Sequence, residues 1–425
     1  MGLASRLGRL LPLLSLTLSG HDAARITSGE DEPIVQIQDL VDELLKNNPD
    51  IRSNQHRFDA ASKRPSQLST LPEPKLSFTN FGVGHPFSRL SESNFAYQGF
   101  GFTQEVPYPG KLALAGEEAR KDAQSEQEIY RMTILDKTAE LKIAYYDWFQ
   151  VTKAIEITHK HRDLLERVET IARARYAVGK GIQQDVLKAQ VEQSVLVQQL
   201  EILKQKKSVI EARIRSLLNT ERSLGRPAEI KMSVLPLRLD QVLASVDQQA
   251  PRLRAQRALL EGRAVGMARA KKEYHPDFAF TFQWLKTGAP FPDYYVATAE
   301  MKIPVYFWRK QRLGVAEAVA RFQQARQSYV SARQELVFMI KDFYLTASTS
   351  ERLLALLQSG IIPQASLSLQ SALAGYEVGS VDFVTLLNNF VTLLTYEMQY
   401  YEELAKHEQA LARLEALLAL PLTRP

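Results

Sequence analysis

Apolar residues in the second half of the chain recur at a heptad spacing. From Val315 to Phe343 they are separated alternately by three and four positions, over about four heptads. The positions are Val315, Ala318, Phe322, Ala325, Tyr329, Ala332, Leu336, Met339 and Phe343. This spacing predicts a long helix in a coiled coil, and the alternation of alanine with larger side chains favours close approach of a partner helix.

Two patches follow a different pattern, in which apolar and polar residues alternate. Aromatic residues from Phe278 to Trp284 alternate with small or polar ones, and a second alternating run extends from Tyr295 to Ile303. An earlier patch alternates from Leu76 to Asn80, and glycines interrupt its partner run at about 95–106. Period-two alternation predicts strands with one apolar and one polar face. We therefore expect two β-hairpins, at about 74–106 and about 277–305.

Internal similarity indicates that one unit occurs twice. The motif Tyr176-Ala-Val178-Gly179 recurs 200 positions later as Tyr376-Glu-Val378-Gly379. The segment 213–218 is likewise similar to 413–418, at the same offset. Because the landmarks keep their order and spacing, the chain is predicted to be a duplicated unit of about 190 residues.

Each copy predicts a first helix, a hairpin, a very long helix, a tight turn at glycine and a returning helix. The first helices are expected at 37–70 and 239–274, the long helices at 111–178 and 310–378, and the returning helices at 182–219 and 382–419. Gly360 and Pro363 predict a bend in the second long helix, because proline has no amide hydrogen and clashes one turn back.

The predicted organisation of the chain follows from this duplication. The first structural repeat spans 37–220 and the second spans 239–420, with an inter-repeat linker at 221–238. A flexible segment at 22–36 precedes the first repeat, and a short tail at 421–425 follows the second.

The first 21 residues are typical of a signal peptide. Arg6 and Arg9 form a basic start, and six leucines between positions 10 and 18 form a short apolar core. An apolar core of roughly ten residues suits export and is too short to span a bilayer. We therefore expect the mature protein to lie outside the cytoplasm.

Composition excludes several kinds of chemistry. The chain has no cysteine, so it has no disulfide, no thiolate metal site and no cysteine for a lipid anchor. The net charge of +5 is spread along the sequence, which does not indicate a nucleic-acid partner. Neither a phosphate-binding loop nor a zinc-protease motif occurs. We expect no enzyme activity, no cofactor and no metal site.

The predicted strands have the length and two-faced character of membrane-spanning β-strands. Surface hairpins on a soluble domain are the alternative reading of the same pattern. Four strands are too few to close a spanning barrel, which needs at least about eight. If these strands cross a membrane, several chains contribute to one barrel, and the helices extend together on one side of it.

Over essentially its whole mature length, the sequence resembles the TolC family of outer-membrane efflux proteins. The resemblance is carried by the duplicated unit, by the Tyr-x-x-Gly turns, and by the segments 105–111 and 304–310 that leave each hairpin. Those two exit segments look most like the heavy-metal (CzcC/CusC-like) branch. Many relatives in that branch carry a lipid on an amino-terminal cysteine, which this chain lacks.

The resemblance implies a fold that is mainly α-helical with a membrane β-barrel. Such proteins are homotrimers, with a twelve-stranded barrel in the outer membrane and a long α-helical coiled-coil barrel in the periplasm. They conduct substrates passively from an inner-membrane pump, here one of the resistance-nodulation-division type, and a periplasmic adaptor. Outer-membrane lipid is a further expected partner.

The resemblance also places the narrow periplasmic entrance at the helix turns. Asp185 matches an acidic position of the entrance, but Thr385 and Asn388 stand where the second copy would carry acids. Asp382 is a further entrance candidate, although it is equally plausible as a helix cap. The candidate turn and adaptor-contact residues are Tyr176, Gly179, Tyr376 and Gly379.

Two other functions fit parts of this pattern. A periplasmic coiled-coil scaffold or adaptor would have the helices without a membrane barrel. An exit duct for type I protein secretion would share the whole architecture and differ only in cargo. The sequence does not name the cargo, which in such ducts includes metal ions, drugs and proteins.

Overall fold

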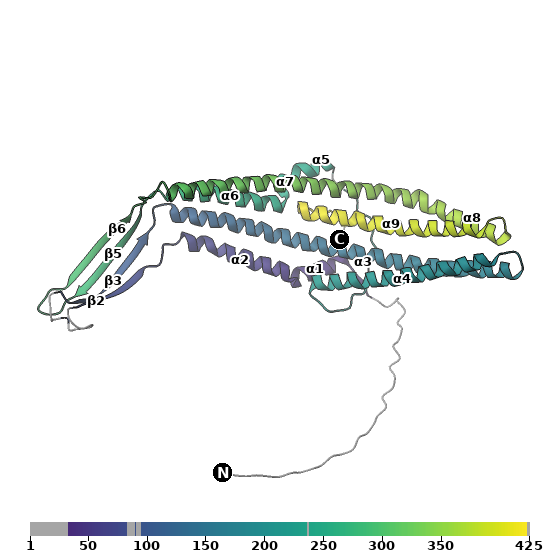
Figure 1. The fold of residues 1–425 in the computed structure, drawn as a ribbon, viewed down its shortest axis with the longest axis horizontal. Helices are drawn as coiled ribbons and strands as arrows, with labels where there is room; N and C mark the ends of the chain where they lie inside the picture. Colours follow the sequence, from purple (N-terminus) through teal and green to yellow (C-terminus); the bar gives the residue numbers. More distant parts are fainter. Residues whose placement is uncertain (1–32, 83–89, 91–94, 236–237, 423–425) are drawn as a thin grey trace, which may run out of the picture.

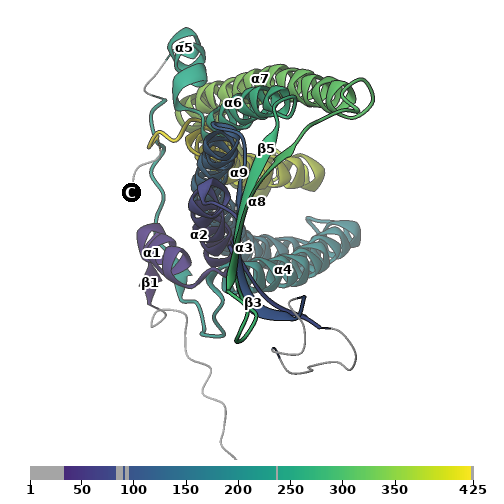
Figure 2. The ribbon, with the colours of Figure 1, turned by 90° about the vertical axis from the view of Figure 1, so that its left-hand side faces the viewer.

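A computed structural model describes residues 33–82, 90, 95–235 and 238–422. The molecule is elongated, with all four long strands at one end and both helix turns at the other (Figure 1). Seen from the strand end, the helices lie on an arc that is open on one side (Figure 2). The chain is therefore a curved wall of helices with a sheet at one end.

The longest helix, α3 (Lys111–Ala177), has 67 residues. At a rise of 1.5 Å per residue it is about 100 Å long. Toward the strands it packs against α2 (Pro49–Ser69) and α6 (Pro251–Lys272). Toward the turns it packs against α4 (Gln183–Leu218) and α9 (Phe383–Leu418). One helix thus connects the two ends of the molecule.

The equivalent helix of the second repeat is divided. It consists of α7 (Gln311–Leu356), the π-helical segment η2 (Leu357–Ile361) and α8 (Ile362–Val378). The bend expected at Gly360 and Pro363 corresponds to η2, which ends just before the proline. Since proline has no amide hydrogen to donate, a π-helical turn is one way to accommodate the interrupted ladder.

The heptad positions of α7 lie on its inward side. Ala325, Ala332 and Leu336 are buried, and none of the other six predicted positions is exposed. Within the second repeat, α7 packs against both α6 and α9. The predicted coiled-coil packing of this helix is confirmed.

The first helix of each repeat is broken, and the predictions of single helices at 37–70 and 239–274 were wrong. The pairs are α1 (Ile37–Asn47) with α2 in one copy, and α5 (Leu239–Gln249) with α6 in the other. The residue before each proline, Asn48 or Ala250, has an extended backbone. A proline ring disfavours helical geometry in the residue that precedes it, which explains both breaks.

The two hairpins form one antiparallel sheet. Its strands, in spatial order, are β2 (Lys75–Phe81), β3 (Tyr97–Val106), β5 (Asp277–Lys286) and β6 (Tyr294–Lys302). The hairpins join where β3 pairs with β5. The sheet thus takes two strands from each copy of the duplicated unit.

The strand register gives the sheet one apolar face. Residues directly opposite each other in an antiparallel pair lie on the same face. One such row across the four strands is Phe78, Phe100, Trp284 and Tyr295. A row of the other face contains Thr103, Thr281 and Thr298, and the hydroxyls of the first two lie 2.9 Å apart.

Glycine interrupts the alternation of β3 for a steric reason. A Cβ atom placed on Gly99 would lie 1.9 Å from the backbone oxygen of Trp284 on the neighbouring strand. Only a residue without a side chain fits so close to another backbone. The glycine that weakens the sequence pattern is therefore a packing requirement of the sheet.

Short strands bring the start of the described chain beside the segment between the repeats. β1 (Ile34–Val35) pairs in parallel with β4 (Arg226–Pro227). Ile34 and Val35 belong to the segment 22–36, which was predicted to be flexible, and for these two residues the prediction was wrong. The predicted signal peptide, 1–21, lies outside the described residues.

The inter-repeat segment is bound to α9 through Ser233. The amide of Ser233 donates to Glu408 at 2.6 Å, and its carbonyl oxygen lies 2.8 Å from Nε2 of His407. At the other end of the chain, the amide of Leu422 donates to Glu415 at 2.7 Å. Residues 423–425 of the predicted tail lie outside the described part.

Candidate entrance at the helix turns

The turn of the first repeat connects α3 to α4. Gly179 has a φ of +72°, a left-handed conformation that suits glycine at a helix end. The amide of Lys180 donates to the carbonyl of Arg175 at 2.9 Å. Ile182 is at the N-cap position of α4 and provides no side-chain hydrogen bond.

The turn of the second repeat connects α8 to α9 and is more tightly bonded. Gly379 has a φ of +89°, and the carbonyl of Gly375 accepts from the amides of Gly379 and Ser380 at 3.0 and 2.9 Å. A Cβ on Gly375 would lie 2.5 Å from a methyl carbon of Val381. The chain therefore folds back more closely here than in the first turn.

Asp382 caps α9. Its side chain accepts from the amide of Thr385 at 2.8 Å and from the Thr385 hydroxyl at 3.0 Å. These bonds, that from the backbone amide first, hold the pKa of Asp382 below its usual value. Of the two roles considered for Asp382, helix capping is the one that its geometry displays.

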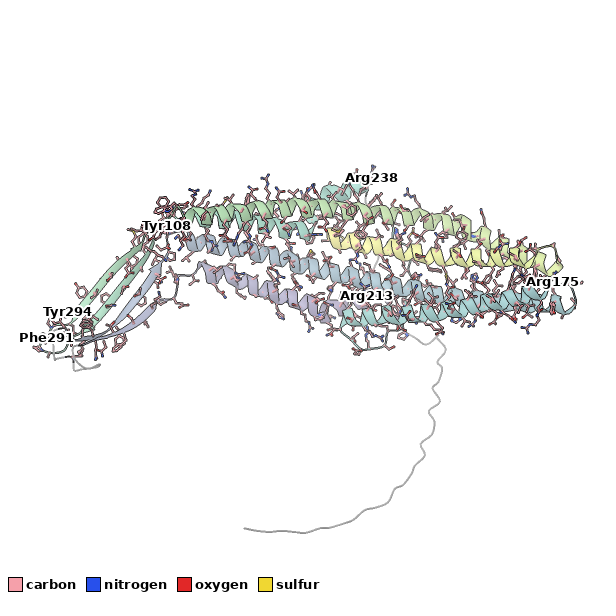
Figure 3. The ribbon with its side chains drawn as sticks, in the orientation of Figure 1. Tyr108, Arg175, Arg213, Arg238, Phe291 and Tyr294 are labelled. Carbon is pink, nitrogen blue, oxygen red and sulfur yellow. The ribbon has the colours of Figure 1, made fainter. Side chains whose placement is uncertain are left out.

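Arg175 joins the two turns across the repeats. Its side chain donates to the carbonyl of Tyr376, to that of Glu377 at 3.1 Å and to that of Lys180 at 3.1 Å. The guanidinium also lies over the ring of Tyr376, 4.8 Å from its centroid. Figure 3 places Arg175 at the end of the molecule opposite the strands. The Arg175 side chain thus binds carbonyls in the last turn of α8 and one carbonyl in the turn that follows its own helix.

Tyr376 lies between the two helix pairs. It is 2% exposed, and its ring packs edge-on against Phe383 with the centroids 5.6 Å apart. Its hydroxyl donates to Asp185 of α4 at 3.3 Å. Burial, together with the nearby Asp185 carboxylate, raises the pKa of Tyr376 to about 12. The tyrosine is therefore neutral and able to donate this bond.

The other predicted residues of this end lie at the surface. Tyr176, the counterpart of Tyr376, is 48% exposed. Thr385 and Asn388 are exposed as well, on the first two turns of α9. The structure thus brings together Asp185, Tyr376 and the backbone at Gly379, and leaves Tyr176 and Asn388 outside this contact.

Arg175 is the residue of this site that sequence reasoning missed. The signal was present in the internal alignment, where the position opposite Arg175 is Gly375. A cation in the last turn of a helix suits the helix dipole, so the residue looked like an ordinary helix end. Its contacts with the other repeat depend on how the two helix pairs pack.

Comparison with known proteins identifies the family. A model of the outer membrane efflux protein family matches residues 40–220 and 242–420, one match for each copy of the duplicated unit. The chain belongs to this family. It is accordingly an outer membrane efflux protein, and its membership of this family confirms the resemblance seen in the sequence. Compared with the curated proteins, the sequence has no significant match.

Solved structures of membrane channels and of an outer membrane protein share the fold of this efflux protein. CusC superposes with a TM-score of 0.79 at 14% identity, over 91% of this chain and 92% of CusC. MtrE of Neisseria gonorrhoeae, in its open state, gives 0.77 at 16% identity, over 91% of this chain and 90% of MtrE. VceC of Vibrio cholerae gives 0.76 at 15% identity, over 90% and 95%. At these identities the likeness concerns the fold.

Helices do not provide a membrane span in the described part of the chain. No described helix combines the length and the apolar character that crossing a bilayer requires.

Proposed function

We propose that three copies of this chain form the outer-membrane exit duct of a tripartite efflux system. Each copy contributes its four strands to a twelve-stranded barrel and its helices to a periplasmic tube. The observation that supports this proposal is the four-stranded sheet, apolar on one face and polar on the other, at one end of a curved wall of helices. An apolar face suits lipid, and a polar face suits a water-filled lumen.

We further propose that the turns connecting α3 to α4 and α8 to α9 form the periplasmic entrance. They lie at the end of the molecule farthest from the sheet (Figure 1). Asp185, Asp382, Thr385 and Asn388 would contribute its polar lining, with Asp185 as the acid nearest the contact between the repeats. The contacts of Arg175 and Tyr376 would hold the two helix pairs together in the narrow state.

The partners of the duct follow from this arrangement. A periplasmic adaptor would bind at the turns, where Tyr176 and Val178 are exposed by 48% and 68%. The energy for export would come from an inner-membrane pump of the resistance-nodulation-division type, with this chain as a passive conduit. The exit segments of the hairpins favour the heavy-metal branch, and the cargo is best sought by screening a deletion strain against metals and drugs.

Membrane fractionation tests the duct directly. We expect the native protein to resist extraction by high salt, to dissolve in detergent, and to migrate as a trimer whose mobility changes on heating. A protein released from the periplasm by salt or osmotic shock, and monomeric without detergent, would instead be a soluble scaffold and would end the proposal.

Replacement of Asp185 tests its place in the entrance. We expect trimers carrying Asp185→Asn, in a planar bilayer, to change in single-channel conductance or in block by a trivalent cation, because one carboxylate per chain is lost. Asp163→Asn removes an exposed carboxylate of α3 farther from the turns and serves as the control. If Asp185→Asn behaves as wild type in both measurements, Asp185 is a helix-end residue only.

A further inference from the structure

The two segments that lead from the sheet into the long helices have diverged. They are the first exit, 107–111, between β3 and α3, and the second exit, 303–312, between β6 and the start of α7. Both lie at the junction of strands and helices, where Tyr108 is labelled in Figure 3. In a duct that spans the outer membrane, this junction is at the periplasmic surface of the bilayer.

The first exit is bound within the chain. Tyr108 stacks on His275 with the ring centroids 4.2 Å apart, and its amide donates to Asp277 at 2.8 Å. The side chain of Lys111 is 8% exposed and pairs with Asp277 at 2.8 Å and Glu273 at 3.2 Å. The aromatic ring and the cation of this exit are thus already bound within the protein.

The second exit presents the same kinds of group to its surroundings. Tyr306, Phe307 and Trp308 are 67%, 51% and 53% exposed. Their rings pack on one another, with Trp308 5.1 Å from Phe307 and 6.2 Å from Tyr306. The amides of Lys310 and Arg312 donate to the carbonyls of Tyr306 and Phe307 at 2.9 Å each. The cluster is therefore held by an ordered turn that continues into α7.

Three exposed cations follow this aromatic cluster. They are Arg309, Lys310 and Arg312, and within the described part of the chain none is paired with a carboxylate. The first turn of α7 contains no acidic residue. The positive end of the helix dipole does not favour cations at that place, so an external anion would relieve the repulsion.

We propose that the second exit binds phospholipid at the periplasmic surface of the outer membrane. In this arrangement the rings of Tyr306, Phe307 and Trp308 lie among the lipid headgroups, and the three cations bind lipid phosphates. Tryptophan and tyrosine favour this interface, and basic side chains beside it are attracted to anionic headgroups. Because only the second repeat provides such a segment, a trimer has three of these contacts. The proposal rests on the membrane-spanning duct proposed above.

Charge argues for lipid over a neighbouring copy as the occupant. In a trimer, β6 would pair with β2 of the next copy, and the segment 70–74 that leads into β2 includes a single acid, Glu73. One carboxylate cannot balance three cations. A phospholipid surface supplies many phosphates and also accepts the exposed rings.

Tryptophan fluorescence separates this inference from the proposed function. The chain has three tryptophans: Trp148 is fully buried among helices, Trp284 is in β5, and Trp308 is in the second exit. Trp284→Phe leaves Trp308 as the only exposed reporter, and Trp308→Phe leaves Trp284. Both trimers are reconstituted into vesicles of phosphatidylcholine whose acyl chains carry bromine, which quenches nearby indoles.

Quenching is expected in both variants, and for Trp308 it should be strongest when the bromines are near the headgroups. Quenching of Trp284 without quenching of Trp308 would agree with the proposed duct but refute the lipid contact. The second exit would then be covered by a neighbouring copy of the trimer. No quenching of either tryptophan would overturn the proposed membrane duct itself.

A second arm tests the cations. Brominated phosphatidylglycerol is added as a minor component to unbrominated phosphatidylcholine, and its quenching of Trp308 is compared with that by brominated phosphatidylcholine at the same fraction. A single basic residue near an anionic surface favours the anionic lipid by about fivefold. The excess quenching should disappear in the triple variant R309Q/K310Q/R312Q and persist in the exposed-lysine control K204Q. Equal quenching by the two lipids in the unsubstituted segment would refute binding through the cations.

Discussion

The two turns at the helix end descend from one sequence motif, and their environments differ. In the second turn, Tyr376 is buried, contacts Phe383 and donates to Asp185 of the other repeat. In the first turn, Tyr176 is 48% exposed. The backbones are similar, since both turns use a glycine with positive φ. The two turns therefore share a backbone shape, and the differences in their side chains make the second turn the contact between the repeats.

Three of the substitutions between the turns bear directly on these contacts and on the helix caps. Arg175 faces Gly375 in the internal alignment, Asp185 faces Thr385, and Ile182 faces Asp382. Arg175 and Asp185 of the first repeat both bind Tyr376 of the second. The first repeat thus provides the polar partners, and the second provides the buried ring and the better-capped helix.

The largest difference should appear when each tyrosine is truncated. Tyr376→Ala removes a buried ring from between the helix pairs, which typically costs about 3–5 kcal/mol. Tyr176→Ala removes an exposed ring, and we expect a cost of about 0.5 kcal/mol or less. Hydrogen exchange of the amides in α8 and the start of α9 measures both. Equal protection in the two variants would mean that the buried contact does not stabilise this end.

Replacing the glycine of each turn should reduce stability by less than replacing Tyr376, and by different amounts in the two turns. Gly379→Ala and Gly179→Ala each force alanine into a left-handed conformation, at a cost of about 1 kcal/mol. At Gly379 the new methyl group would also lie 3.2 Å from the Arg175 guanidinium, whereas at Gly179 it would meet nothing within 4 Å. We expect thermal unfolding to show the larger loss for Gly379→Ala. The reverse order would contradict the position given to Arg175.

The smallest expected effect concerns the helix caps. Asp382→Ala removes the hydrogen bonds to Thr385, so the amides at the start of α9 should exchange faster. Ile182→Asp places an acid at the uncapped position of α4 and should slow exchange there. Unchanged exchange in both variants would show that capping does not distinguish the turns.

The repeating features of the fold were predictable from the sequence. In α7, and in β5 and β6, one face of each element has different surroundings from the other face. This difference produces a periodic pattern of apolar residues, which can be seen in a single sequence. The breaks before Pro49 and Pro251 were also encoded locally. They were missed because the helical pattern on either side was given more weight than the restriction that proline places on its predecessor.

The contact between the turns was predictable only in part. Asp185 and Tyr376 were both selected, but as residues of separate turns, because nothing in their spacing places them 3.3 Å apart. Arg175 was not selected, because its partners are backbone carbonyls, and its difference from Gly375 in the internal alignment does not reveal those partners. Contacts between elements far apart in the chain depend on packing that local patterns do not encode.

The most direct test of this account compares two arginines at the same helix end. Arg175→Gln removes the contacts between the turns. Arg173→Gln removes an equal charge whose partner, among the residues that the structure describes, is Glu169 of the same helix. The measurement is the single-channel conductance of each trimer in a planar bilayer. The account predicts a higher conductance for Arg175→Gln and a wild-type value for Arg173→Gln. Equal conductances would show that the contact between the turns does not control the entrance.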